Sequence, residues 1–432
     1  EPLLWLQRPR GHCARARARF LRRYTEEFFR QTGACRLPGF TRGVHLIRIQ
    51  GMAGDSKASM MLVQLMSGST IPVPASSMTV VCDLRHAVAS CLALPAAQVR
   101  LLGAGGLLED EQLVSEIGGT MLQAVIFAQS RYLVIVGGGD TVGGRALRSV
   151  ERFCVDQGAW EAMPPLLEPR VGATVAVLNK CLYVCGGHDD HGNGLNSVER
   201  FDAAQGRWLS MPPMRDQRVF ASAAVLNGHL YILGGRTQAG LGLASVERFD
   251  PALGRWEVLP SMGERRYGGA AATVDGHIYA VGGEDDTSDA WGWEGGDNLG
   301  GGLRTVERFS PELRRWEWTS SMKDRRCLPC MAAVEGHLYV CGGEDDIGHV
   351  LSTVERLNPA ADTWESLPLM NERRVGAAAV ELGGVLYVCG GRNDGARGLS
   401  SAECFHPETR RWQTLPSMCE RRFGAAAAVV CG

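Results

Sequence analysis

The chain has 432 residues, of which 45% are hydrophobic and 21% are charged, and its formal net charge is −2. Such a composition is that of ordinary water-soluble domains, and the length suits two or three of them. No stretch reaches 18 uncharged apolar residues, and residues 1–51 lack the apolar core of a secretory signal. We therefore expect neither a membrane nor nucleic acid as the partner.

The N-terminal residues 1–51 differ in charge from the rest of the chain. They hold eleven Arg against three Glu, a balance of +8, which leaves 34 basic and 44 acidic residues, or −10, for the remainder. Blocks of one sign are usually solvated tails. We predict a basic, disordered segment whose deletion leaves the melting temperature unchanged.

Residues 60–128 show the pattern of a small α+β domain. A strand, a turn and a strand are expected over 60–73, a helix over 82–92, further extended segments over 94–110, and a last strand over 121–127. This pattern predicts a β-grasp, and the segment resembles ubiquitin, most specifically in VRLLGAGGLLED at 99–110. The resemblance implies an apolar patch that docks to ubiquitin-system machinery, formed by Met66, Leu102 and Val125.

From residue 132 onward the chain repeats. Tryptophans recur at intervals of 48 residues, with one interval of 60, at Trp160, Trp208, Trp256, Trp316, Trp364 and Trp412. Gly-Gly pairs, the glutamate of SVER-like segments and an arginine recur in step. A fixed period of this length indicates a solenoid, a propeller or another repeat architecture.

Each repeat contains four strand-like segments, as in 373–382, 386–391, 399–405 and 411–416. Four short strands per repeat with tight turns between them predict propeller blades. The first repeat starts at its second strand, whereas the chain ends on an unpaired first strand over 422–430. We expect this last strand to complete the first blade and so close the ring, which leaves no sheet edge open at the seam.

The LYVCGG, SVERFD and RRxGAA segments, together with the spaced tryptophans, resemble the Kelch repeat in six copies. The predicted fold class is therefore an all-β six-bladed Kelch propeller over 132–432, preceded by a small α+β ubiquitin-like β-grasp domain. The resemblance implies a protein-binding module.

Chemistry-bearing motifs do not recur with the repeat. No Ser-His-Asp or Cys-His set follows the period, and no Gly-rich loop opens a helix to hold phosphate. Cys327 and Cys330 form a CxxC, but residues three apart in a strand face opposite sides. We therefore expect no enzyme activity, no metal and no cofactor. Other cysteines occupy core positions of the repeat, which favours a reducing compartment, the cytoplasm with the nucleus left open.

The recurring arginine heads the first strand of each blade, so strand direction places all six on one face of the ring. A guanidinium offers planar paired donors to carboxylates. The Kelch resemblance implies partner contacts at Arg170, Arg218, Arg266, Arg326, Arg374 and Arg422. The alternative is pairing inside the chain with acids of loops on the same face, namely Asp189, Asp190, Glu284, Asp285, Asp286, Glu344, Asp345 and Asp346.

The insertion in the fourth repeat, 287–302, carries Trp291 and Trp293. Loops often carry function, and tryptophans are common anchors of interfaces, so both are candidate partner contacts. The alternative is that they pack on an adjacent loop.

These features together predict a non-enzymatic, substrate-binding adaptor that binds acidic protein segments and joins a ubiquitin ligase complex. The BTB domain usual in Kelch adaptors has no counterpart in residues 1–131. The alternative is an actin-binding, cytoskeletal or scaffold Kelch protein, and a metal-dependent oxidase is a third class.

Overall fold

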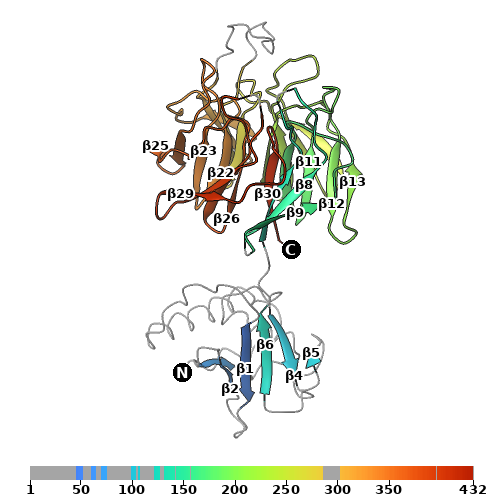
Figure 1. The fold of residues 1–432 in the computed structure, drawn as a ribbon, viewed down its shortest axis with the longest axis vertical. Helices are drawn as coiled ribbons and strands as arrows, with labels where there is room; N and C mark the ends of the chain where they lie inside the picture. Colours follow the sequence, from blue (N-terminus) through green and yellow to red (C-terminus); the bar gives the residue numbers. More distant parts are fainter. Residues whose placement is uncertain are drawn as a thin grey trace. The chain divides into compact units, whose positions relative to one another are not determined.

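The chain divides into two units, Glu1–Gln129 and Ser130–Gly432 (Figure 1). The computed structural model describes strands of the first unit and, in the second, residues 131–285 and 302–431 apart from positions 142, 156 and 396. No helix among these residues is long and apolar enough to cross a membrane.

The first unit contains a six-stranded sheet in the order β3-β2-β1-β6-β4-β5. Its strands are β1 (His45–Gly51), β2 (Met60–Gln64), β3 (Thr70–Pro74), β4 (Val99–Gly103), β5 (Gly106–Leu107) and β6 (Met121–Ile126). Four of them, β2, β3, β4 and β6, lie where the sequence predicts strands, while the predicted helix over 82–92 lies outside the described residues.

Strand β1 lies inside the range predicted to be a tail, and it pairs antiparallel with both β2 and β6. The sheet therefore begins at His45, before the expected boundary at residue 51. This strand was not expected because residues 1–51 are rich in Arg, and only the last seven of them, HLIRIQG, carry an alternating apolar pattern.

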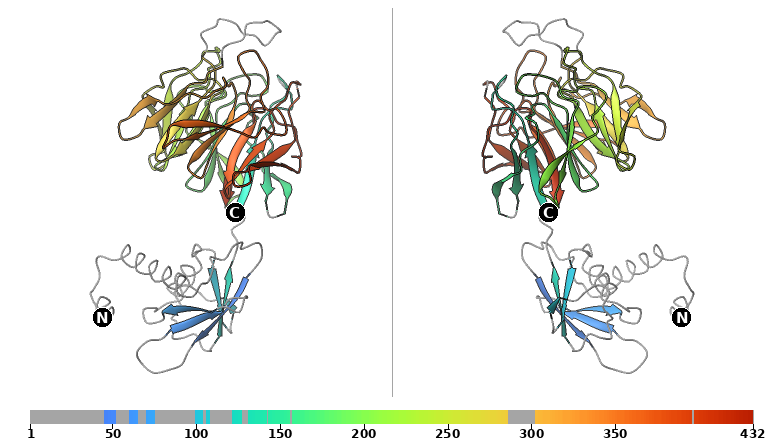
Figure 2. Two further views of the ribbon diagram at one scale, coloured as in Figure 1. Left: turned by 90° about the vertical axis from the view of Figure 1, so that its left-hand side faces the viewer. Right: turned by 90° about the vertical axis from the view of Figure 1, so that its right-hand side faces the viewer.

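The second unit is a propeller, and its described residues form six four-stranded antiparallel sheets, which we number as blades 1 to 6 (Figures 1 and 2). Blade 1 comprises β30 (Ala426–Cys431), β7 (Arg131–Val136), β8 (Val150–Cys154) and β9 (Ala159–Met163). Blade 2 comprises β10 (Thr174–Leu178), β11 (Cys181–Cys185), β12 (Val198–Asp202) and β13 (Arg207–Met211). Blade 3 comprises β14 (Ser222–Leu226), β15 (His229–Leu233), β16 (Val246–Asp250) and β17 (Arg255–Leu259).

Blade 4 comprises β18 (Ala270–Val274), β19 (His277–Val281), β20 (Val306–Ser310) and β21 (Arg315–Trp318). Blade 5 comprises β22 (Cys330–Val334), β23 (His337–Cys341), β24 (Val354–Asn358) and β25 (Thr363–Leu367). Blade 6 comprises β26 (Ala378–Leu382), β27 (Val385–Cys389), β28 (Ala402–His406) and β29 (Arg411–Leu415).

The two ends of this unit share blade 1, as predicted. The C-terminal strand β30 pairs antiparallel with β7, with Ala426 opposite Val136 and Val430 opposite Tyr132. In Figure 2 the red strand at the C-terminus lies beside a teal strand in both views. The ring is therefore closed by strands from both ends of the unit, and the inner edge of β7 is covered.

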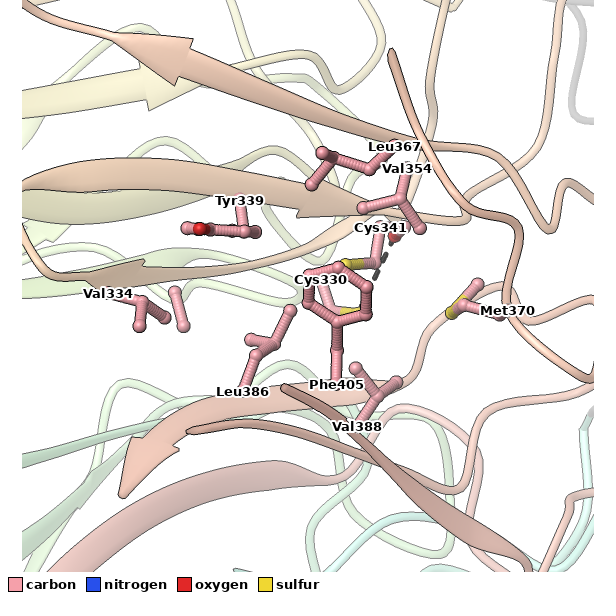
Figure 3. Packing of buried hydrophobic residues seen from close by; sticks show 11 residues of the cluster. Cys330, Val334, Tyr339, Cys341, Val354, Leu367, Met370, Leu386, Val388 and Phe405 are labelled. Carbon is pink, nitrogen blue, oxygen red and sulfur yellow. Dashed lines mark hydrogen bonds between the residues drawn. The ribbon is translucent and has the colours of Figure 1, made fainter. Parts of the chain in front are cut away.

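The hydrophobic core lies between neighbouring blades. Figure 3 shows one such layer, in which Cys341 and Tyr339 of blade 5 pack against Leu386 and Phe405 of blade 6. The second strand of every blade is almost wholly buried because it is covered on both faces, which explains its continuous apolar sequence.

The recurring tryptophans fasten each blade to the linker that enters it. The Trp208 indole donates a hydrogen bond to the Pro164 carbonyl at 2.8 Å, and the other five make the equivalent bond to Pro416, Pro212, Pro260, Ser320 and Pro368. The Gly-Gly pairs allow close approach: a Cβ on Gly186, whose φ is 65°, would lie 2.3 Å from the Arg218 carbonyl oxygen. Both columns therefore have an architectural role in the propeller.

Candidate protein-binding face

The six arginines that head the first strands are buried, with exposed fractions of 0–2%. In blade 2, Arg170 donates from Nε and Nη2 to Glu199 Oε1 at 3.1 and 2.9 Å, and from Nη1 to the Gly186 carbonyl at 2.7 Å. The same ion pair recurs in every blade, as Arg170–Glu199, Arg218–Glu247, Arg266–Glu307, Arg326–Glu355, Arg374–Glu403 and Arg422–Glu151. The prediction that these arginines contact a partner is therefore wrong, because their donors are used inside the blades.

The arginines do pair with acids inside the chain, as the alternative expected, but these are not the acids that were expected. The acids expected from the sequence were those of the loops, whereas the carboxylates come from the glutamate of the VER segment in the third strand. Both columns recur in every repeat, so their joint periodicity was the signal for this pairing. Each glutamate also accepts a backbone bond from the entering linker, as Glu199 Oε2 does from the Leu167 N–H at 2.7 Å.

Charge pairing outweighs burial at Glu151. Burial raises the pKa of this carboxyl, but hydrogen bonds from Arg422 and from the Cys419 N–H, with the Arg422 charge, bring the pKa below its ordinary value of 4.5. The Arg–Glu pairs thus join first strand, third strand and linker within each blade.

A ring of six backbone hydrogen bonds lies two residues beyond the buried arginines. Each residue of the ring donates its N–H to a carbonyl of the neighbouring blade at 2.8–3.0 Å, and the members are Gly172, Phe220, Gly268, Leu328, Gly376 and Gly424. We call this end of the central channel the mouth. A cavity of about 190 Å³ adjoins it, lined by the starts of the innermost strands.

Two of the six ring positions carry side chains that fill the mouth. Phe220 and Leu328 have φ of 52° and 51°, in the left-handed region that the four sister glycines adopt at 62–66°. Phe220 packs edge-on to Tyr267, with ring centroids 5.6 Å apart, and lies 6.1 Å from the Phe423 ring. The glycines give these side chains room, since a Cβ on Gly172 would lie 2.9 Å from the Phe220 ring.

Charged side chains surround this apolar centre. The residue directly after each Gly-Gly pair forms a β-bridge to the residue preceding the ring, and these six form what we call the mouth rim, Gly139, His188, Arg236, Glu284, Glu344 and Arg392. The Arg236 guanidinium lies 4.4 Å from the Tyr267 ring centroid, and Arg392 lies 5.8 Å from that of Phe423.

Arg392 and Glu344 form an ion pair across blades 6 and 5 at 2.8 Å. Burial raises the pKa of Glu344, and the Arg392 charge and its hydrogen bond offset only part of this. The mouth rim therefore presents both signs of charge over an apolar centre, an arrangement that suits a polypeptide with mixed side chains.

A second set of arginines, one residue before the buried ones, is exposed. These four linker arginines are Arg265, Arg325, Arg373 and Arg421. Arg325 lies 3.7 Å from an Asp346 carboxylate oxygen, and Arg373 lies 3.3 Å from one of Asp394. The arginine-bearing face predicted from sequence thus exists, but its accessible members are the neighbours of the predicted ones.

The remaining predicted site residues are Trp291, Trp293, Met66, Leu102 and Val125. Trp291, Trp293 and Met66 lie outside the described residues. Leu102 lies in β4 and Val125 in β6, neighbouring strands whose backbone register pairs Leu102 with Gln123. Among the described residues, no group of three His, Cys, Asp or Glu side chains is placed to hold a metal.

Comparisons with known proteins agree with the propeller. Residues 123–317 match the family model described as the KLHDC2/KLHL20/DRC7 Kelch-repeats domain, and residues 325–371 and 373–418 match that of the Kelch motif. The solved structure called "Structure of YjhT" superposes with a TM-score of 0.54 at 13% identity, covering 67% of this chain and 98% of that one, which is a likeness of fold alone. No curated protein sequence matches this chain.

Proposed function

We propose, from the premise that the second unit is a Kelch-repeat propeller and hence a protein-interaction module, that this protein is a substrate-binding adaptor. Its propeller binds a segment of another protein at the mouth, and the chain takes no part in catalysis. The observation that carries this proposal is the mouth rim, where Arg236, Arg392 and Glu344 lie over the apolar centre formed around Phe220.

Burial of the Arg–Glu pairs supports this assignment by elimination. Since the six buried arginines serve the blades, they are eliminated as ligand contacts, whereas the mouth rim and the linker arginines supply polar side chains on the loop-bearing face. Interfaces commonly place aromatic and arginine side chains at their centre.

The link to ubiquitin-system machinery rests on the first unit. The positions of β2, β3, β4 and β6 agree with the strands expected of a β-grasp, which supports the ubiquitin-like proposal. Met66, Leu102 and Val125 are the proposed docking patch, and Trp291 and Trp293 are proposed as further anchors for the substrate. We place the protein in the cytoplasm, with the nucleus left open.

Affinity capture with the full chain tests the proposal. The mouth variant carries Arg236→Ala and Arg392→Ala, and the matched control carries Arg207→Ala and Arg411→Ala, two exposed arginines at the starts of β13 and β29 at the opposite end of the blades. The mouth variant should lose the captured substrate and the control should keep it. Equal capture by both would overturn the mouth as the binding face.

The two classes of partner separate in the same experiment. An adaptor of the ubiquitin system should capture ligase or proteasome subunits, and these should be lost when Met66, Leu102 and Val125 are changed to Ala. Co-sedimentation with actin filaments, insensitive to that triple change, would favour the cytoskeletal alternative instead.

A further inference from the structure

The outer strand of blade 4 departs from the repeat at its last residue. This strand, β21, ends on Trp318, which is 57% exposed. The corresponding residues of blades 2, 5 and 6 are small and polar, namely Ser210, Ser366 and Thr414. The indole lies beside Gly263 of the linker that enters blade 4, where a Cβ would come within 2.7 Å of the ring. Blade 4 thus exposes a tryptophan at its outer end, and the linker glycine makes room for it.

Arg314 lies on the same side of blade 4 as this tryptophan. Its Nη2 donates to Glu257 Oε1 of blade 3 at 2.9 Å, and its side chain is 57% exposed. The linker beside Trp318 also comes from blade 3. An exposed guanidinium and an exposed indole therefore occupy the two ends of β21 on the side that faces blade 3.

The opposite side of the strand carries one charge of each sign. Arg315 donates from Nε and Nη2 to Glu317 Oε1 at 3.1 and 2.8 Å, and its side chain is 65% exposed. The second oxygen of Glu317 accepts from Arg308 Nη2 at 2.9 Å. The strand thus presents a positive and a negative side chain two positions apart.

This order of residues is complementary to itself. Strand β21 is the last strand of its sheet, so the N–H and C=O groups of its outer edge can pair with a further strand. Two antiparallel copies with Trp316 opposite Trp316 place Arg315 opposite Glu317 twice, and Arg314 opposite Trp318 twice. Opposite charges in cross-strand pairs are stabilising, and a guanidinium over an indole is attracted by the ring.

Blade 3 offers a natural comparison. Among the fourth strands that the structure describes, β17 has the same order of charges, with Arg255 and Glu257. The positions of Arg314 and Trp318 are held there by Gly254 and Val258. The complete set of complementary residues therefore belongs to blade 4.

We propose that the outer edge of β21 is a self-association surface, at which a second copy of this chain forms an isologous dimer by antiparallel strand pairing. The paired edge is shorter than a standard interface, so the dimer is weak and forms at micromolar concentrations. The mouth lies on the axis of the ring rather than at this edge, so pairing leaves the mouth of each copy free. The dimer does not depend on the mouth being the binding face.

Sedimentation velocity of the full chain tests the surface. From about 1 to 200 µM, the mean mass should rise toward twice that of the monomer. Trp318→Ser introduces the residue that blade 5 has at this position, and it should weaken association at least about tenfold. The matched control is Val258→Ser, at the same position of blade 3 with 50% exposure, and it should leave association unchanged.

An exchange of charges tests the register. Arg315→Glu and Glu317→Arg each set like charges opposite each other, so either variant alone should remain monomeric. An equimolar mixture of the two should dimerise, because each carboxylate of the first variant then faces a guanidinium of the second. Arg255→Glu, the same change in blade 3, should dimerise like the unchanged chain.

Three results would overturn the proposal. These are an unchanged chain that stays monomeric over the whole range, equal weakening by Trp318→Ser and Val258→Ser, and a mixture of charge variants that does not associate. Melting temperatures control for folding. Trp318→Ser keeps every ion pair of the strand, so it decides the question if a charge variant does not fold.

Discussion

Neighbouring arginines in this chain have opposite roles. Arg374 is 2% exposed and bonded to Glu403, while Arg373 is exposed and forms an ion pair with Asp394. The repeat identified the column that contains Arg374, but it could not say that this column faces inward. Adjacent residues of an extended segment face opposite sides, and the repeat alone does not say which of the two sides is the interior.

The pair Arg373 and Arg374 therefore offers a stringent comparison. Arg374→Ala leaves the Glu403 carboxylate buried without its partner and should lower the free energy of unfolding by about 3–5 kcal/mol. Arg373→Ala removes an exposed ion pair and should cost about 0–1 kcal/mol. Urea unfolding of both variants measures this, and similar losses would contradict the assignment of buried and exposed columns.

Acid should weaken the blades through Glu151. Because its pKa is lowered in the folded state, its contribution to stability is complete above the unfolded pKa of about 4.5 and is lost as the pH falls through the folded pKa. Glu151→Gln should be less stable at pH 7, and the difference from the unchanged chain should shrink as the pH falls below 4.5. A pH-independent difference in unfolding free energy would show that the carboxylate charge is not responsible.

Phe220, at the mouth, has a backbone conformation that favours glycine. Its φ of 52° lies in the left-handed region, which costs a residue with a Cβ about 1–2 kcal/mol relative to glycine. Both Phe220→Gly and Phe220→Ala lose the buried ring, but the glycine variant should be the more stable by about 1 kcal/mol. Thermal unfolding that ranks alanine above glycine, as in ordinary helices and strands, would be the contrary result.

At the scale of elements, the strands of the propeller were predictable because the same pattern of four strands recurs in six repeats. Closure through β30 was predictable for the same reason, since a first strand without partners and a blade without a first strand complement each other. Strand β1 was not, because it occurs once, in a segment whose charge dominates its composition.

Two deletions locate the boundary of the N-terminal sheet. Removing residues 1–44 should leave the sheet intact, whereas removing residues 1–51 takes away β1, which pairs with both β2 and β6. Amide hydrogen exchange over 60–64 and 121–126 should then accelerate only in the longer deletion. Unchanged exchange in both would return β1 to the dispensable tail that its charge suggested.

For the whole molecule, the period of the sequence determined the architecture, and strand direction determined which face carries the loops. The details of that face depended on spatial neighbours far apart in the chain. Glu344 and Arg392 meet from different blades, and Arg421 meets Gly398 across the seam. Such contacts have no signature in a single repeat.

The central claim is that the mouth face binds the partner, and a hydrogen-exchange footprint of the full chain with its captured substrate tests it most directly. Protection should fall on the loops of 188–197, 236–245, 344–353 and 392–399 and on the linker arginines. The hairpins at 179–180, 227–228 and 335–336, at the other end of the blades, should exchange as in the free protein. Protection confined to those hairpins or to the outermost strands would contradict the account.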